Sequence, residues 1–423
     1  MDECITRNLI PRLPSRAAYF DYLDRWTVGT IDDLRAHMTS RALVKAFLLE
    51  TSRNSHDVSA TEAFARLGER IEEIDHNLYR VGRPNEPQDW ALLETTESRF
   101  PVIYTAMERS DADRRVKNVV DKSPWLDRAW LTSPMFHALW EHIGEANIPE
   151  RFSKIVFEHE SVYESNAAEG QLTGDDSEVA LLEEEQDTDR TDDEADLLQP
   201  ERRRARLQIT ERIGILRSAL QGMRSHYDPL QSIVALRMPA PRRGGHDIYY
   251  DGRFTNRSDS VLSLRQTVQL VTALYQGTTM LAEDAARPRS TSYEEGTTRT
   301  LGTPVFVRFS KSLDTDTFER LIASLSHKRN RFRLWGRPIA RGTGKIHVYA
   351  VDNHLWQPLD LEITRNHIYA MLHEDTCGNA IHRLIANIQR YVDPKIEAYI
   401  GDRSYESFVK QAMGESSSGN PRD

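Results

Sequence analysis

A basic and aromatic run between residues 327 and 349 is the strongest candidate for ligand binding in this sequence. Read as two strands, 331–335 and 345–351, it places alternate side chains on one face of a sheet. Cations neutralise phosphate and aromatic rings stack on bases, so such a face suits single-stranded nucleic acid. The side chains predicted to bind nucleic acid are Arg331, Arg333, Trp335, Arg341, Lys345, His347 and Tyr349. The alternative is a solvated face without a ligand, because Asp360 and Glu362 would lie on a neighbouring strand.

Histidines gather in the same part of the chain, together with a cysteine. His373, Cys377 and His382 could supply zinc ligands, but their spacing matches no zinc motif. Cys377 also stands at the start of an expected helix, where the dipole could lower the thiol pKa and a histidine could act as base. A hydrolase or nuclease-like site around 347–382 is therefore the alternative to a binding role. No metal or cofactor is predicted.

The motifs of familiar enzymes are absent from the sequence. It contains no GxxxxGK[ST] phosphate loop, no GxGxxG after a strand, no HExxH and no GxSxG. The Asp360 and Glu362 pair also lacks the following lysine of metal-dependent nucleases. We therefore expect a non-enzymatic regulatory or interaction protein with a nucleic-acid-binding part, and whether it catalyses any reaction stays open.

Charge is distributed unevenly along the 423 residues. Between Ser165 and Gln199, thirteen acidic residues stand against a single Arg190, a charge of −12. Because the whole chain carries −10, the remainder carries +2. Polar, highly charged sequence cannot bury enough apolar surface to fold, so residues 165–199 are predicted to be a disordered acidic linker. The near-neutral remainder argues neither for nor against a nucleic-acid partner.

Cysteine usage and the chain start indicate the compartment. Cys4 and Cys377 lie far apart and provide no disulfide framework. The acidic start lacks the apolar stretch of a signal peptide, and no run approaches the roughly 20 apolar residues of a membrane span. We expect a cytoplasmic protein that does not act in a membrane.

Residues 1–150 are predicted to form a helical domain. Ser59 and Glu62 have the spacing of a capping box at a helix start. The apolar stripe that follows at helical spacing is Phe64, Leu67, Ile71 and Ile74. Five of the seven tryptophans fall in this region, and we interpret them as core, with a peptide-binding groove as the alternative.

A long helix is predicted from about 202 to 227. Apolar residues recur there at alternating spacings of four and three, the pattern of a heptad seam that packs against a partner helix. Packing against the chain's own helices or sheet is the alternative. The residues predicted to bind a protein partner are Ile209, Ile213, Leu216 and Leu220.

Strands and helices alternate in the rest of the chain: strands are expected over 304–309, 345–351, 359–363 and 395–400, and a helix is expected over 315–326. The expected fold class is therefore α+β, with a helical N-terminal domain followed by mixed-sheet parts. After 1–150, the predicted divisions are a strand (151–164), the acidic linker (165–199), a first α+β unit (200–282), a loop or hinge (283–302), a second α+β unit (303–404), and a C-terminal helix with a disordered tail (405–423).

The two α+β units share a weak internal similarity at an offset of 98 residues. Each contains two predicted strands joined by a glycine-containing turn. The matching residues are Leu236, Arg243, Gly244 and Ile248 in the first unit and Leu334, Arg341, Gly342 and Ile346 in the second. A duplicated unit, with two ferredoxin-like modules side by side, is one interpretation, and chance is the other.

Overall fold

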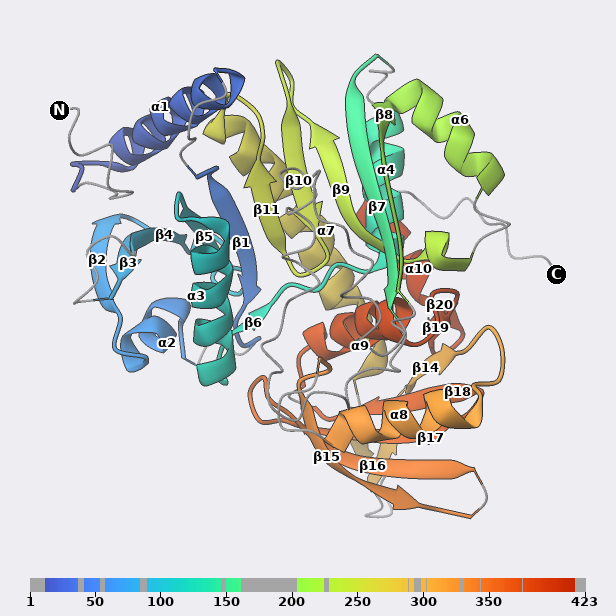
Figure 1. The fold of residues 1–423 in the computed structure, drawn as a ribbon. Coiled ribbons are helices and arrows are strands. Elements are labelled where there is room, and N and C mark those ends of the chain that lie inside the picture. The colour runs from blue at the N-terminus through green and yellow to red at the C-terminus, as the bar shows by residue number, and fades with distance from the viewer. Residues whose placement is uncertain are drawn as a thin grey trace, which may run out of the picture.

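The computed structural model describes residues 12–36, 42–53, 58–83, 90–145, 150–160, 204–223, 228–287, 289–292, 298–301, 303–326, 331–342, 344–374 and 376–414. Two large antiparallel sheets and the helices around them make the fold α+β, as predicted (Figure 1). The predicted acidic linker and the tail from Glu415 onward lie outside the described residues.

Within the described part of the chain, the larger sheet has eleven strands, ordered β2-β3-β4-β5-β1-β11-β10-β9-β7-β8, with β6 paired to β1. Its strands are β1 (Lys45–Glu50), β2 (Arg70–Asp75), β3 (Leu78–Gly82), β4 (Trp90–Glu94), β5 (Val102–Thr105), β6 (Asp127–Arg128), β7 (Phe152–Glu160), β8 (Arg204–Arg212), β9 (Ile233–Pro239), β10 (Gly245–Tyr249) and β11 (Arg253–Asn256). The pairing of β1 with β11, which sets Lys45 opposite Thr255, joins the N-terminal region to the predicted first α+β unit. These two regions therefore share one sheet.

Both faces of the central strands of the larger sheet are covered. The helices packed with it include α1 (Arg16–Arg35), α2 (Ala60–Arg66), α3 (Arg109–Lys122), α4 (Ser133–Glu145), α6 (Ile213–Met223) and α7 (Val261–Ala286). On β1, Phe47 faces the core formed with α2 and α3, whereas its neighbour Leu48 faces the core that contains α1, α4 and α7. Because a strand alternates its side chains between faces, every residue of β1 is buried.

The smaller sheet is ordered β15-β16-β17-β18-β14-β19-β20. Its strands are β14 (Val305–Arg308), β15 (Leu334–Ala340), β16 (Lys345–Asp352), β17 (Pro358–Thr364), β18 (His367–Leu372), β19 (Glu397–Ile400) and β20 (Arg403–Ser404). The helices that accompany it are α8 (Thr315–Ser326), α9 (Asn379–Tyr391) and α10 (Tyr405–Ala412). Every residue of α9 is buried, because this helix lies between the two sheets (Figure 1).

Helices α1 to α4 fit the expected helical N-terminal region, but strands β1 to β6, which were not predicted, lie among them. The predicted cap is confirmed, since the Glu62 amide donates to Ser59 Oγ at 3.2 Å. The helix ends at Arg66, before Gly68 turns the chain with a φ of 81°. Ile71 and Ile74, predicted to continue the helical stripe, lie instead on β2.

The predicted long helix over 202–227 is wrong. Its first part is β8, in which Ile209 pairs with Ile155 of β7, and α6 begins only at Ile213. A heptad pattern of under three repeats is satisfied equally by a strand followed by a short helix. Leu207 and Ile209 alternate with polar residues along β8, and pairing with the long strand β7 decides the structure.

The predicted hinge and the internal similarity also differ from the structure. α7 continues to Ala286, and the strands β12 (Arg289–Ser292) and β13 (Thr298–Leu301) form a hairpin within the predicted hinge.

The two hairpins that carry the internal similarity have different registers, since Leu236 pairs with Ile248, whereas Leu334 pairs with Asp352. The matching residues therefore do not occupy equivalent positions, and ferredoxin-like modules are not confirmed. A short 3-10 helix (Asp228–Gln231) precedes β9.

Candidate nucleic-acid interface

The smaller sheet has one buried face and one open face. Along β17 and β18 the side chains alternate, with Leu361 and Ile368 in the core and their neighbours toward solvent. Large side chains on the open face are Trp335, Tyr349, Tyr369 and Met371, with exposed fractions of 52%, 54%, 37% and 38%. A group of exposed apolar side chains on one face is typical of a binding surface.

Three aromatic side chains form one side of this face. In the strand register Tyr369 of β18 lies opposite Phe306 of β14, which lies opposite Tyr399 of β19. The ring centroids of Phe306 and Tyr369 are 4.7 Å apart, and those of Phe306 and Tyr399 are 6.3 Å apart. The His367 ring meets Tyr369 edge-on at 4.9 Å. These rings form a continuous platform across β18, β14 and β19.

Two further aromatic side chains continue the open face toward β15. Tyr349 of β16 lies opposite Arg337 of β15 and Asp360 of β17, and Asp360 lies opposite Met371. Trp335 stands two residues before Arg337 and therefore shares its face. We call the five rings that cross the strands the aromatic band: Trp335, Tyr349, Tyr369, Phe306 and Tyr399.

Basic side chains line one end of the open face. Arg308 lies opposite His367 at the ends of β14 and β18. Lys345 begins β16, and its carbonyl oxygen accepts a hydrogen bond from the Arg341 amide at 2.8 Å. We call these four residues, Arg308, Arg341, Lys345 and His367, the basic margin. It runs across the strands beside the aromatic band.

Acidic side chains on the open face are paired with its cations. Glu362 accepts from Lys345 at 2.7 Å and lies 3.2 Å from His347 Nε2. The hydrogen bond from Lys345 is the main reason that the pKa of Glu362 lies below its usual value. Arg308 is paired with Glu397. These acids weaken the positive field that a phosphate would meet, and the exposed Arg337 and Arg341 add to that field.

The predicted side chains Arg331 and Arg333 are not on this face. Both precede β15, which begins only at Leu334, and Arg333 has a left-handed φ of 53°. The Arg331 guanidinium lies 4.1 Å from the Tyr391 ring centroid and donates to the Tyr391 hydroxyl. Arg333 donates to Asp127 Oδ1 at 2.9 Å. Alternation therefore cannot bring either residue to the open face. The structure does place four of the other predicted residues there, Trp335, Lys345, His347 and Tyr349, and Arg341 follows the end of β15 in the turn to β16.

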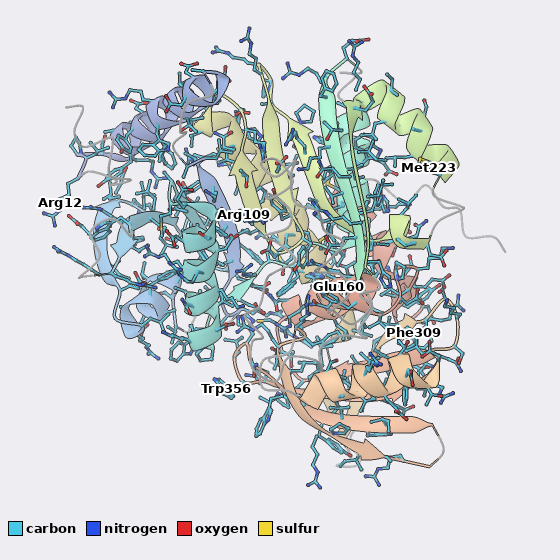
Figure 2. The ribbon with its side chains drawn as sticks, in the orientation of Figure 1. Arg12, Arg109, Glu160, Met223, Phe309 and Trp356 are labelled. Carbon is cyan, nitrogen blue, oxygen red and sulfur yellow. The ribbon has the colours of Figure 1, made fainter. Side chains whose placement is uncertain are left out.

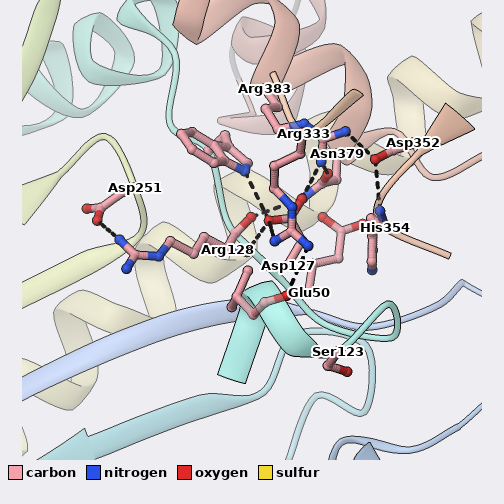
Figure 3. Close-up of polar contacts among 12 residues, drawn as sticks. Glu50, Ser123, Asp127, Arg128, Asp251, Arg333, Asp352, His354, Asn379 and Arg383 are labelled. Atoms are coloured by element: carbon pink, nitrogen blue, oxygen red, sulfur yellow. Dashed lines mark hydrogen bonds and ion pairs between the residues drawn. The ribbon is translucent and has the colours of Figure 1, made fainter. Parts of the chain in front are cut away.

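Asp127 is the centre of a buried ion cluster between the two sheets. Figure 3 shows Arg333 and Arg383 converging on it, and Arg383 also donates to Asp352 Oδ1 at 2.5 Å. Burial alone would raise the pKa of Asp127, but the two guanidinium groups outweigh it and lower the pKa to about 2. Asp352, which has fewer cations near it, keeps a raised pKa because of burial. The cluster ties β6 to the smaller sheet.

The predicted nucleophile and its histidines are not arranged for catalysis. Cys377 is buried, and burial raises its thiol pKa, the opposite of an activated cysteine. His382 is held by Thr279 Oγ1 at 2.9 Å and by the Tyr405 hydroxyl at 2.7 Å, and burial lowers its pKa to about 3. His373 is half exposed and lies 3.3 Å from Asp360.

Within the described residues, Cys377 gathers with two buried carboxylates and not with the histidines. Its thiol and one oxygen each of Glu50 and Glu283 lie within 4.8 Å of one another. Arg99 pairs with both carboxylates, at 2.7 Å from Glu50 and 3.0 Å from Glu283. The Gly378 amide also donates to Glu283 at 2.6 Å. Arg53 also lies 3.6 Å from Glu283, so two guanidinium groups balance the two carboxylates, and we assign the group to structure and not to metal binding.

The predicted partner-binding seam is part of the protein's own core. Ile213, Leu216 and Leu220 lie on the buried face of α6, and Ile209 is partly buried on β8. Three of the four side chains are therefore covered by this chain and are not available to another protein.

The sequence prediction missed the β18 side of the open face. Tyr369 and Met371 were not assigned because β18 was not predicted, whereas Phe306 and Tyr399 lie on strands that were expected but were not singled out as binding residues. Its sequence, His-Ile-Tyr-Ala-Met-Leu, alternates exposed and buried side chains, and this alternation could have revealed the strand.

Comparison with known sequences identifies relatives. Residues 18–407 match the family described as MJECL33-like protein. The chain belongs to this family. A member named "Uncharacterized protein MJECL33", from Methanocaldococcus jannaschii, is 19% identical over 421 residues, which cover 93% of this chain and 96% of that relative. No solved structure matches. Among the described helices, none has both the length and the apolar character that a membrane crossing requires.

Proposed function

We propose that this member of the MJECL33-like family is a non-enzymatic protein that binds single-stranded nucleic acid on the open face of its smaller sheet. The observation that carries the proposal is the aromatic band with the basic margin beside it. Rings accept bases of any sequence by stacking, and cations along one side neutralise the phosphates that connect those bases.

The arrangement of the band and the margin matches the chemistry of an unpaired strand. Tyr369, Phe306 and Tyr399 present rings on neighbouring strands, which lie about 4.8 Å apart. Bases lying over these rings would place their phosphates toward Arg308 and Lys345. In the strand pairing these two residues stand two residues further along than the row of rings. We further propose that this binding serves a regulatory role and takes place in the cytoplasm.

The buried state of Cys377 and His382 removes support from the alternative enzymatic function. A nucleophile must reach its substrate and its base, whereas the thiol is buried with a raised pKa and His382 is bonded to two hydroxyl groups. The protein partner expected from the heptad pattern likewise loses its predicted surface, because three of the four side chains in that seam are core residues.

Fluorescence anisotropy with labelled single-stranded RNA and DNA tests the proposal. We expect Tyr349→Ala to weaken binding by about 5- to 150-fold, since stacking contributes about 1–3 kcal/mol per base. Tyr349→Phe keeps the ring and should bind like the unmodified chain. Met280, which is also about half exposed but lies on α7, provides the control Met280→Ala. Failure of the unmodified chain to bind, or equal binding by Tyr349→Ala and Tyr349→Phe, would overturn the proposal.

A further inference from the structure

The turn between β16 and β17 has an unusual backbone. Leu355 and Trp356 have φ values of 62° and 55°, in the left-handed region that favours glycine. Each such non-glycine residue costs on the order of 1–2 kcal/mol, so two in succession persist only where the surroundings determine the conformation. The Trp356 side chain is nevertheless 61% exposed, so burial of its ring does not offset this cost.

Contacts on either side of Trp356 hold the turn in this conformation. The Asp352 amide donates to the Gln357 carbonyl oxygen at 2.7 Å and closes the turn. The Leu355 amide donates to the carbonyl oxygen of Pro124 at 2.6 Å, which fixes the turn to the segment after α3. His354 is only 2% exposed, and its amide donates to Asp352 Oδ1 at 2.9 Å. The strained turn is therefore built into the junction between the two sheets.

The position of Trp356 continues the open face beyond the sheet. In the register Trp335 lies opposite Val351, which lies opposite Pro358 at the start of β17. Trp356 stands two residues before Pro358, so its Cα is at most about 7 Å from that end of the face. Figure 2 shows Trp356 at this end of the smaller sheet, below the end of α3.

The segment that is bonded to the turn also contacts a cation. The carbonyl oxygen of Pro124 accepts the hydrogen bond from the Leu355 amide, and the next residue is Trp125. The Arg66 guanidinium lies 4.4 Å from the Trp125 ring centroid. Arg66 is partly exposed and is paired with Glu62 at 2.6 Å. The segment bonded to the strained turn therefore presents a guanidinium group over the Trp125 ring, one residue along the chain from Pro124.

We infer that Trp356 is a further stacking residue for the same ligand and extends the nucleic-acid site from the smaller sheet onto its junction with the N-terminal region. This inference rests on the proposed function. From Tyr399 to Trp335 the aromatic band crosses β19, β14, β18, β17, β16 and β15, about 24 Å at the usual strand spacing. A short oligonucleotide is held within the band, whereas a longer one reaches Trp356.

Binding of oligonucleotides of different lengths tests this inference on the full chain. The probes are labelled single strands of about 4, about 8 and about 16 nucleotides, a range that covers known single-strand sites. We expect Trp356→Ala to weaken binding of the longest strand by about tenfold and to leave the shortest nearly unchanged. Trp356→Phe, which keeps an aromatic ring, should restore most of the affinity for the longest strand.

Comparison with Tyr349→Ala separates the inference from the proposed function. Tyr349→Ala should weaken binding of all three lengths, because Tyr349 lies within the aromatic band. If Tyr349→Ala weakens binding while Trp356→Ala binds every length like the unmodified chain, the inference is wrong and the proposed function stands. If the unmodified chain binds none of the probes, both are wrong. Unchanged denaturant midpoints for the variants would show that lost binding is not lost folding.

Discussion

The two sheets of this protein are both antiparallel but differ in what covers them. In the larger sheet, β1, β4 and β10 are buried along their whole length, because helices and core side chains lie on both faces. In the smaller sheet, β17 and β18 alternate between the core and solvent. The central strands of the larger sheet are therefore enclosed in the core, whereas the smaller sheet leaves one face open to solvent, the face that we propose binds nucleic acid.

The ion pairs of the two regions also differ in how deeply they are buried. The Asp127 and Arg383 side chains, where the two sheets meet, are 0% and 1% exposed, whereas Lys345 and Glu362 on the open face are 44% and 27% exposed. A buried charge that loses its partner is costly, whereas an exposed pair contributes little. Substitutions at the junction should therefore change folding, and substitutions on the open face should change binding.

The largest expected effect is at the junction. Arg383→Ala should lower the free energy of unfolding by about 3–5 kcal/mol, because it leaves Asp127 and Asp352 buried with too little positive charge. Lys345→Ala, the matched change on the open face, should cost about 0–1 kcal/mol. Guanidinium unfolding measures both. Similar small losses in the two variants would contradict the contrast between the two regions.

Acid should destabilise the protein through His354. Neither ring nitrogen of this buried side chain has a hydrogen-bond partner among the described residues, and burial lowers its pKa from 6.5 to about 3. The unfolded chain therefore takes up a proton below pH 6.5 that the folded chain resists until about pH 3, and stability is lost across this range as the pH falls.

His354→Phe removes this titration. Relative to the unmodified chain, the variant should gain about 2 kcal/mol of stability between neutral pH and pH 5, since each pKa unit corresponds to about 1.4 kcal/mol. Denaturant unfolding at several pH values measures the difference. Parallel stability curves for the two chains would show that His354 does not resist protonation.

A smaller effect is expected at the basic margin. Arg341→Ala should weaken nucleic-acid binding and reduce the slope of log Kd against log salt by about 0.7, because one phosphate contact of a single strand is lost. Arg243→Ala is the matched control, since Arg243 is an exposed arginine in the turn between β9 and β10 of the larger sheet. Equal salt slopes for Arg341→Ala and the unmodified chain would remove Arg341 from the interface.

The smallest effect concerns the strained turn. Trp356→Gly should raise the free energy of unfolding by about 0.5–1 kcal/mol, because glycine adopts a φ of 55° without the steric cost paid by tryptophan. Trp356→Ala, which keeps that cost, should not show the gain. Thermal unfolding measures both, and a clear loss of stability in Trp356→Gly would mean that the ring contributes packing.

Local patterns predicted much of the smaller sheet. The helix expected over 315–326 has those bounds in α8, and the strands expected over 345–351 and 359–363 are β16 and β17. Strong periodicity with clear turn residues at the ends explains this agreement. The N-terminal strands were missed because strands buried on both faces, such as β1 and β4, have no alternating pattern.

The candidate site was predicted only in part, because the sequence pattern within one strand does not show where that strand begins. Alternation within one strand placed Trp335 and Tyr349 on the open face, but it could not show that β15 begins at Leu334 and that Arg333 turns inward. Arg333 reaches Asp127, 206 positions earlier in the chain, and Arg383 reaches the same carboxylate from 256 positions away. Contacts at such separations depend on the assembled fold and leave no local signal in the sequence.

Ultraviolet cross-linking of a bound single strand, followed by identification of the linked peptides, tests the central claim most directly. If the open face of the smaller sheet is the interface, the cross-links fall on peptides that contain Trp335, Tyr349 and Tyr369, and Tyr349→Ala reduces their yield. Cross-links confined to peptides of the larger sheet, or none at concentrations where the strand is bound, would contradict the account.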